Sequence, residues 1–168
     1  MTTYEYKGMQ LTLADYDQEH MGYFEAAAQH KLVMKKCQAC NLLRWDPGPG
    51  CPWCTSQEWE WQEVSGKGII YSYGIVTHPI MPAFRDWVPY PIVLVELDEQ
   101  RGVPTPDEGL RLLTNLLDTD FKPEKEENVA IGKRVEVVFT DLGEGFSLPQ
   151  FRLSGEPPEG PVWQFEQR

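Results

Sequence analysis

The sequence has few of the side chains on which active sites and nucleic-acid surfaces usually depend. Three histidines and four cysteines occur in 168 residues. Basic side chains are also scarce, because 15 lysines and arginines stand against 26 acidic residues and give a formal net charge of −11. Phosphate groups are bound by basic surfaces, so this charge argues against a general nucleic-acid-binding protein.

Long apolar runs are absent as well. A membrane-spanning helix needs roughly 18 or more apolar residues in succession, and no stretch of this chain approaches that length. The N-terminal residues Met1, Thr2 and Thr3 do not resemble a secretory leader. We therefore expect a cytoplasmic protein without a membrane segment, and a hydrophobic content of 41% is sufficient for a packed core.

No catalytic set can be assembled from the remaining residues. The histidines His20, His30 and His78 are scattered along the chain, and no Ser-His-acid or Cys-His arrangement is indicated. A glycine-rich phosphate loop is also missing, since Gly66 and Gly68 alone are a weak signal. The sequence therefore does not predict an enzyme that acts alone.

What the chain does have is a compact cysteine motif. All four cysteines fall into two Cys-x-x-Cys pairs, Cys37 with Cys40 and Cys51 with Cys54. A two-residue spacer lets a tight turn direct both sulfurs at one ion, and two such turns supply four thiolates in a tetrahedron. We predict that these four cysteines bind a zinc ion. A site closed by four sulfurs has no open position, so its predicted role is structural.

Three other uses of the cysteines are chemically possible. Two disulfides would satisfy the count, but they are typical of secreted proteins. A redox-active dithiol would place one pair at the start of a helix in a strand-helix-strand unit, and the pattern here differs. Iron in a rubredoxin-like site is chemically allowed, because Cys51-Pro52-Trp53-Cys54 resembles a rubredoxin turn. Zinc is the metal we expect.

The N-terminal part is expected to contain an arm and a helix. Residues 1–13 read as an extended arm that lies on a partner or on the domain itself. A helix is predicted from a cap at Asp15 or Asp17 to about Gln29. Its apolar stripe, which includes Tyr23 and Phe24, either faces the core or docks on another subunit. Neither His20 nor His30 has a neighbouring set of metal ligands.

The rest of the chain is predicted to be mainly β. Strands at 31–36 and 59–64 frame the cysteines, and tryptophans at positions 45, 53, 59 and 61 are available to cover the metal. Five further strands are predicted at 69–77, 91–97, 110–117, 134–140 and 148–153, with a bend at Gly74. Five curved antiparallel strands indicate a partly open Greek-key barrel, the OB fold, and a sandwich is the alternative.

These elements predict four consecutive parts. They are an arm and helix at 1–30, a zinc ribbon at 31–64, an OB-fold barrel at 65–154 and a C-terminal tail at 155–168. The long loop from His78 to Tyr90 is rich in proline and aromatic residues, so it either packs over the barrel mouth or forms a contact surface. The tail ends with the apolar residues Val162, Trp163 and Phe165, which suggest an anchor on a partner.

The order of these parts resembles that of a known family, the domain-of-unknown-function-35 proteins. Members of this family combine a rubredoxin-like zinc ribbon with an acyl-CoA-associated OB fold. The resemblance covers roughly residues 15–153. Its motifs lie at 23–27, 31–37, 51–54, 61–68, 71–73, 95–98, 112–116, 132–139 and 149–152. The chain departs from the family pattern at Tyr23-Phe24, at residues 45–48 and near residues 101–108, which bears on partner and substrate rather than on fold.

The resemblance implies an accessory subunit. Such proteins are similar to partners of thiolase-fold enzymes, including acyl-CoA thiolases and lipid-transfer-type aldolases, and some accompany acyl-CoA hydratases. The expected function is a non-catalytic zinc subunit in a hetero-oligomer that cleaves or forms C–C bonds on acyl-CoA, with the ester at the interface. Candidate contacts for the CoA phosphates are Lys31, Lys35, Lys36 and Arg44. The alternative is an OB-fold protein that binds single-stranded nucleic acid, which would need a basic groove with stacking aromatic residues.

Overall fold

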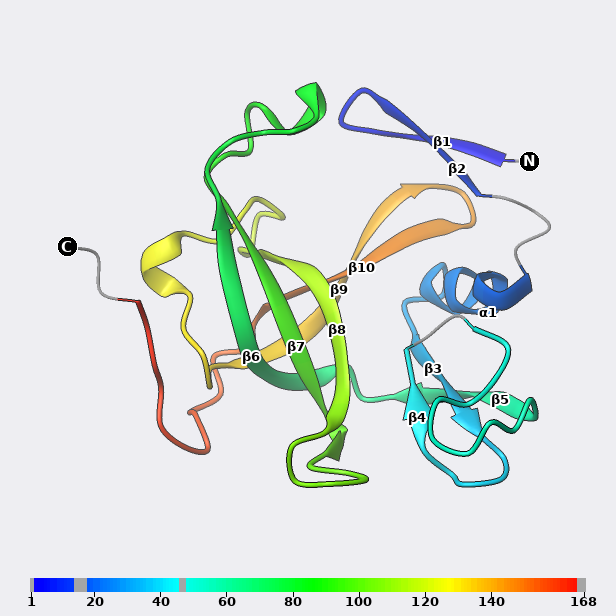
Figure 1. The fold of residues 1–168 in the computed structure, drawn as a ribbon. Coiled ribbons are helices and arrows are strands. Elements are labelled where there is room, and N and C mark those ends of the chain that lie inside the picture. Colours follow the sequence, from blue (N-terminus) through cyan, green and yellow to red (C-terminus); the bar gives the residue numbers. More distant parts are fainter. Residues whose placement is uncertain (1, 14–17, 46–47, 166–168) are drawn as a thin grey trace. The chain divides into compact units, whose positions relative to one another are not determined.

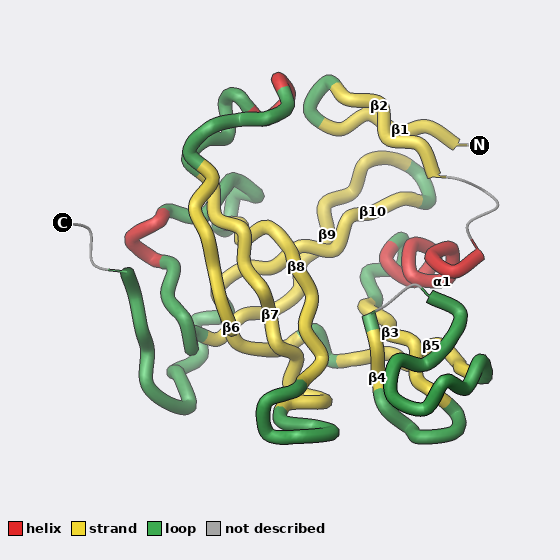
Figure 2. The backbone as a smooth tube through the Cα atoms, in the orientation of Figure 1, coloured by secondary structure: helices red, strands yellow, loops and turns green. Residues whose placement is uncertain are grey.

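The computed structural model describes residues 2–13, 18–45 and 48–165 (Figure 1). The chain forms two compact units. The first consists of Met1–Ser65, Glu99–Leu110 and Phe139–Pro149, and the second of Gly66–Asp98, Arg111–Val138 and Gln150–Arg168. Figure 2 shows that the described chain consists mostly of strands and loops. No helix among the described residues is long and apolar enough to cross a membrane.

The first unit begins with a β-hairpin. Strand β1 (Thr2–Tyr6) pairs antiparallel with β2 (Met9–Leu13). Lys7 and Gly8 connect them, both with positive φ, as a tight hairpin turn requires. Tyr4 stacks on Phe146 with ring centroids 4.4 Å apart. The expected extended arm is thus a folded hairpin that packs on its own chain.

Helix α1 (Gln18–Ala27) confirms the predicted helix, and the predicted caps Asp15 and Asp17 lie outside the described residues. Tyr23 and Ala27 are buried, at 6% and 0% exposure. The helix approaches the ribbon closely at Gly22, where a Cβ atom would lie 2.1 Å from Nε1 of Trp61. The apolar stripe therefore packs within its own unit.

The ribbon is a three-stranded sheet in the order β4-β3-β5. Strand β3 (Leu32–Cys37) is central, and it pairs antiparallel with β4 (Leu43–Arg44) and with β5 (Trp59–Val64). The two framing strands that the sequence predicts are thereby confirmed. Leu32 and Met34, at 2% and 1% exposure, supply the apolar part of its core.

Five strands form a closed barrel in the order β10-β8-β7-β6-β9, and this confirms the predicted five-stranded barrel over the sandwich. The strands are β6 (Lys67–Val76), β7 (Tyr90–Arg101), β8 (Gly109–Leu117), β9 (Arg134–Gly143) and β10 (Phe146–Leu153). Strand β10 runs parallel to β8, with Phe151 opposite Leu116. A parallel pair needs a long crossover, and the segment from Asp118 through β9 provides it.

The core of the second unit follows the alternation of its strands. Val93, Val95 and Leu97 occupy every second position of β7, and each is 0% exposed. Ile70, Leu116, Val135 and Phe151 join them at 0% exposure. The predicted bend at Gly74 is not where the strand is irregular, because Gly74 pairs regularly with Ile92 and the register shifts between Ile70 and Ser72.

The long loop between β6 and β7 is ordered around its own aromatic side chains. Its short 3-10 helix η1 (Pro82–Phe84) is followed by Trp87 and Tyr90, whose ring centroids lie 5.9 and 5.7 Å from that of Phe84. Ile80 at the tip is 94% exposed. A second 3-10 helix, η2 (Glu126–Asn128), lies in the crossover.

Candidate metal centre

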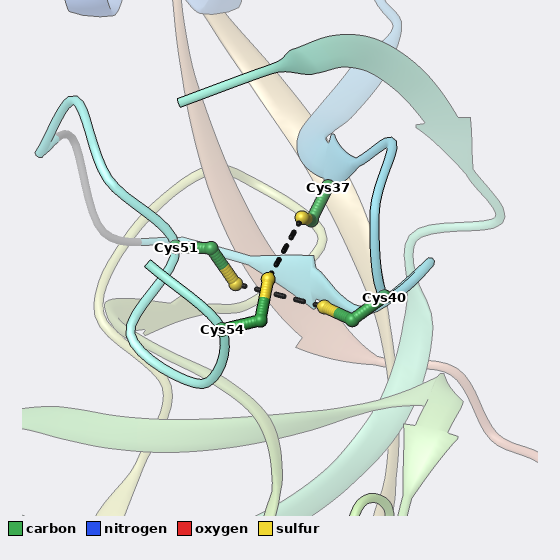
Figure 3. Close-up of side chains that lie close together, drawn as sticks. All are labelled: Cys37, Cys40, Cys51 and Cys54. Atoms are coloured by element: carbon green, nitrogen blue, oxygen red, sulfur yellow. Dashed lines mark hydrogen bonds between the residues drawn. The ribbon is translucent and has the colours of Figure 1, made fainter. Parts of the chain in front are cut away.

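The first cysteine pair lies at the end of β3. Asn41 N–H donates to the carbonyl of Cys37 over 2.9 Å, and Cys37 N–H donates to the carbonyl of Leu42 over 3.0 Å. Asn41 has a φ of 62°, in the left-handed region that asparagine tolerates better than most residues. This reversal brings the chain back into β4 and turns both sulfurs to the same side (Figure 3).

The second pair repeats this local geometry. Thr55 N–H donates to the carbonyl of Cys51 over 2.9 Å, and Cys51 N–H donates to the carbonyl of Ser56 over 2.8 Å. Thr55 has a φ of 63°, which is unusual for a β-branched residue. Its hydroxyl donates to the carbonyl of Cys54 over 2.7 Å. Each Cys-x-x-Cys turn thus ends in one residue of left-handed conformation.

The two turns bring all four sulfurs together, as Figure 3 shows. Sγ of Cys37 lies 3.6 Å from Sγ of Cys54, and Sγ of Cys40 lies 3.6 Å from Sγ of Cys51. All four Sγ atoms lie within 4.8 Å of one another, and all four cysteines are free thiols. A zinc–sulfur bond of about 2.3 Å implies a tetrahedron with edges of about 3.8 Å. The cysteines are therefore positioned to bind a metal.

The thiols of this cluster differ in acidity. The backbone N–H of Cys40 donates to the sulfur of Cys37 and lowers the pKa of the Cys37 thiol to about 6. The N–H of Leu42 has the same effect on Cys40, but desolvation and the neighbouring thiols outweigh it and raise the pKa of Cys40 to about 12. Without a cation, four adjacent sulfurs cannot all carry charge. A bound divalent cation would favour the fully deprotonated set.

The arrangement limits what a bound ion could do. Four sulfur donors complete a tetrahedral site and leave no position for water or substrate. Among the residues that the structure describes, no other group of three or more histidine, cysteine or acidic side chains is placed to hold a metal. The cluster is suited to a structural ion that joins the two turns.

Two of the four candidate CoA contacts are buried inside the ribbon. Arg44 is 2% exposed, and its Nη1 donates to the carbonyls of Gly48 and Gly50 over 2.6 and 2.8 Å. Lys35 is also 2% exposed, and its Nζ lies 4.3 Å from the centre of the Trp59 ring. Both cations contact groups within the ribbon, and their burial leaves them inaccessible to a ligand.

The other two candidate contacts lie nearer the surface. Lys31 is exposed and forms an ion pair with Glu63 at 3.4 Å. Lys36 is half-buried at the edge of an open depression of about 250 Å³, which Asn41 and Glu99 also line. Neither position forms a cluster of cations suited to several phosphates.

The four tryptophans contact different parts of the first unit. Trp45 meets Tyr23 of α1 edge to face, with ring centroids 4.7 Å apart. Trp53 donates from Nε1 to Glu108 over 3.3 Å. Trp59 and Trp61 meet edge to face at 5.1 Å beside Lys35. Their role as a cover for the metal stays a prediction.

A polar cluster that the sequence does not reveal surrounds Asp141. His30 Nε2 lies 2.8 Å from Oδ1 of Asp141, and the Ser147 hydroxyl donates to the same oxygen over 2.5 Å. The His30 ring stacks on Phe139 at 5.1 Å. His30 and Ser147 lie 111 and 6 positions from Asp141 in the chain, so no local sequence motif predicts the cluster.

Two family models match consecutive parts of the chain. Residues 24–60 match the "ChsH2, rubredoxin-like zinc ribbon domain", and residues 61–140 match the "ChsH2, C-terminal OB-fold domain". A solved structure described as "Ltp2-ChsH2(DUF35) aldolase" is 36% identical, has a TM-score of 0.67, and is covered over 99% of its chain and 84% of this one.

Curated proteins give the same family. A "DUF35 domain-containing scaffold protein" of Methanocaldococcus jannaschii is 32% identical over 67% of this chain and 70% of its own length. The "Probable enoyl-CoA hydratase alpha subunit" of Thermomonospora curvata is 42% identical over 77% of this chain, but the match spans 36% of that longer protein. With its four-cysteine ribbon and five-stranded OB-fold barrel, the chain belongs to the domain-of-unknown-function-35 (DUF35) family.

Proposed function

We propose that this chain is a non-catalytic, zinc-containing accessory subunit of a thiolase-fold enzyme that cleaves or forms C–C bonds on acyl-CoA esters. The observation that carries this proposal is the 36% identity to nearly the whole of one chain in the structure described as "Ltp2-ChsH2(DUF35) aldolase". An identity of this size over 99% of that chain supports a shared mode of assembly as well as a shared fold.

Zinc is the proposed metal. Four thiolates in a closed tetrahedral set are typical of structural zinc sites, and the matching family model is that of a zinc ribbon. Cys37, Cys40, Cys51 and Cys54 would hold the ion. When bound, it supplies a fixed link between the two turns, and the ribbon presents its surface to the enzyme subunit.

The absence of a catalytic group among the described residues supports an accessory role. Ser147 is 2% exposed, so its hydroxyl is not accessible to a substrate. The hydroxyl donates to Asp141, and the hydrogen bonds from Ser147 and His30 lower the pKa of that carboxyl, which makes it a weaker base. His30 contacts the same carboxylate oxygen. A nucleophilic serine needs access to its substrate and an effective base, and this buried hydroxyl has neither, so we assign the cluster a structural role.

A hydratase subunit is a second candidate. The 42% identity to a probable enoyl-CoA hydratase alpha subunit favours it. Both candidates have an acyl-CoA substrate, and in both the chemistry takes place in another chain or domain. If this chain contacts CoA, Lys31 and Lys36 are the remaining candidates beside the ribbon.

Co-expression with candidate enzymes tests the proposal. The tagged chain would be produced with each thiolase-like or hydratase-like enzyme encoded beside its gene, and size-exclusion chromatography with light scattering would follow the complexes. We expect one stable hetero-oligomer whose acyl-CoA turnover exceeds that of either partner alone. Turnover by the isolated chain, or salt-sensitive binding of oligonucleotides with no enzyme complex, would contradict the proposal.

A further inference from the structure

The C-terminal segment of residues 154–165, here called the strap, is fastened to the barrel of its own unit (Figure 1). Trp163 and Ile131 exchange both backbone hydrogen bonds, at 2.8 and 3.1 Å. Phe165 N–H donates to the Tyr73 hydroxyl over 2.8 Å. The Gln164 side chain donates to the carbonyls of Glu126 and Glu127 over 3.3 and 2.9 Å. The end of the strap is therefore held mainly through its backbone.

The start of the strap is held by charge. Arg134 is 6% exposed and binds Asp98 through both terminal nitrogens. The same guanidinium lies 3.5 Å from Glu156 and 3.4 Å from Glu159 of the strap. Close approach is required at Gly132, whose φ is +89° and where a Cβ atom would lie 2.5 Å from the Pro161 carbonyl oxygen. The strap is thus a fixed part of the second unit.

The strap and strand β6 enclose a groove of about 340 Å³. Its apolar lining comes from Tyr73 and Ile75 of β6, from Ile131, and from Trp163 and Phe165 of the strap. The last two side chains are 56% and 64% exposed. Clefts of a few hundred Å³ with such a lining are typical binding sites, and exposed aromatic residues in a fixed frame are typical of interface hot spots.

The charged residue that lines the groove is acidic. Glu126 lines it, and among the described residues its carboxylate has no ion-pair or hydrogen-bond partner. The bordering segment 118–128 holds five acidic and two basic side chains. Two copies of the chain would each bring a net charge of −11, so a second copy is electrostatically disfavoured. The charge complement of this groove is a cation beside an apolar group.

We propose that this groove is the docking site for a segment of the enzyme subunit that places one large apolar side chain between Trp163 and Ile75, with an adjacent lysine or arginine on Glu126. The inference rests on the proposed function, because the occupant belongs to that enzyme. The strap lies beyond the residues matched by the OB-fold family model, which end at 140.

Site-specific crosslinking tests the occupant directly. A photoreactive phenylalanine analogue would replace Phe165 in the complex obtained by co-expression, with the same replacement at Phe121, which is 44% exposed outside the groove, as the control. We expect the probe at position 165 to crosslink one enzyme segment with an apolar residue next to a lysine or arginine. Crosslinks to a second copy of this chain, or equal yields at both positions, would overturn the proposal.

Two matched pairs of variants measure the contribution of the groove. Glu126→Lys reverses a charge that lines it, whereas Glu127→Lys makes the same change one residue away, outside the lining. Trp163→Ala removes a wall, whereas Val162→Ala changes its exposed neighbour. We expect each groove variant to weaken enzyme binding at least about tenfold and each control less than about threefold.

The outcomes separate this inference from the proposed function. If the wild-type complex forms and all four variants bind equally, the groove is not the docking site while the accessory role stands. If the wild-type chain forms no complex with any candidate enzyme, both are overturned. If a small apolar molecule that copurifies with the isolated chain fills the groove and Glu126→Lys leaves enzyme binding unchanged, the groove is a ligand site and the docking proposal is wrong.

Discussion

The barrel buries mainly aliphatic and aromatic side chains and pairs its buried ions, Arg134 and Glu96, with side chains of opposite charge. The ribbon buries two cations and two of its four thiols. In the barrel, Val93, Val95 and Phe151 are 0% exposed. In the ribbon, four polar side chains are at most 3% exposed, namely Lys35, Arg44, Cys37 and Cys51. Burial of apolar surface is the main stabilising contribution in the barrel. The ribbon needs a partner for each buried polar group, and its four thiols are positioned to bind a metal in that role.

Removal of the metal should break this contrast most strongly. Structural zinc contributes about 10–16 kcal/mol of binding free energy in zinc-finger peptides, which is as large as the whole unfolding free energy of a typical domain, about 5–15 kcal/mol. We expect Cys51→Ser to abolish metal binding and the protection of β3 and β5 against hydrogen exchange, while β7 residues such as Val93 and Val95 stay protected. Metal analysis checks the loss of binding, and hydrogen exchange measured by mass spectrometry checks the protection of the ribbon and barrel strands.

Treatment of the wild-type chain with a chelator is the matched control for that variant. It removes the metal without a change in sequence, so it should reproduce the same exchange pattern. A metal-free chain with a protected ribbon that still assembles would show that the site is dispensable.

A cavity in the barrel should produce the opposite pattern. Phe151→Ala removes a fully buried ring and is expected to lower the free energy of unfolding by about 3–5 kcal/mol. Because the ribbon binds its metal through its own four cysteines, the variant should still bind one metal per chain. Urea unfolding and metal analysis test this. Leu113→Ala, at a position that is 67% exposed, should change stability by less than about 0.5 kcal/mol.

A smaller effect is expected from the buried cation beside the metal loop. Arg44 holds the carbonyls of Gly48, Pro49 and Gly50, and Arg44→Met would leave them without these donors. We expect about a tenfold loss of metal affinity, as for other groups that orient metal ligands, measured by competition with a chromophoric chelator. Lys36→Met, a nearby half-buried change, should leave the affinity unaltered. Equal affinities for both variants would mean that Arg44 does not support the site.

The smallest expected effect concerns acid and the strap. A hydrogen bond from Lys67, with further help from Arg134, lowers the pKa of Glu156. A lowered pKa in the folded state gives stability that is present above the unfolded value of about 4.3 and is lost as pH falls through the folded value. In the wild-type chain, the protection factor of the Trp163 amide should therefore decrease as the pH is lowered.

Glu156→Gln isolates that effect. The variant should show weaker protection of Trp163 at pH 7, and its difference from the wild-type chain should shrink towards pH 3. A difference that is constant or grows in acid would assign the pH dependence to another group.

Much of the ribbon and barrel could be predicted because the signals are local. The four cysteines lie within 18 residues of one another, and strands such as β7 carry continuous apolar sequence. The hairpin of β1 and β2 was missed because its turn, Lys7-Gly8, lacks the Asn-Gly or Asp-Gly signature.

Burial of charge was the part that sequence could not supply. The sequence predicts Lys35 and Arg44 as candidate CoA contacts because phosphates bind cations, and lysine and arginine are seldom fully buried. Their burial depends on two tryptophans and a glycine-proline loop that take their positions only in the folded ribbon. The His30, Asp141 and Ser147 cluster is equally non-local.

One contact of the first unit has a consequence for self-association. Strand β4 is at the edge of the ribbon sheet, and such edges recruit strands from other molecules. The Gln100 side chain accepts from the Leu43 N–H over 2.6 Å and donates to the Leu43 carbonyl over 2.8 Å. A single amide thus replaces the neighbouring strand at that position. Because both backbone groups of Leu43 are already bonded, a strand from another copy cannot pair with the edge at that residue.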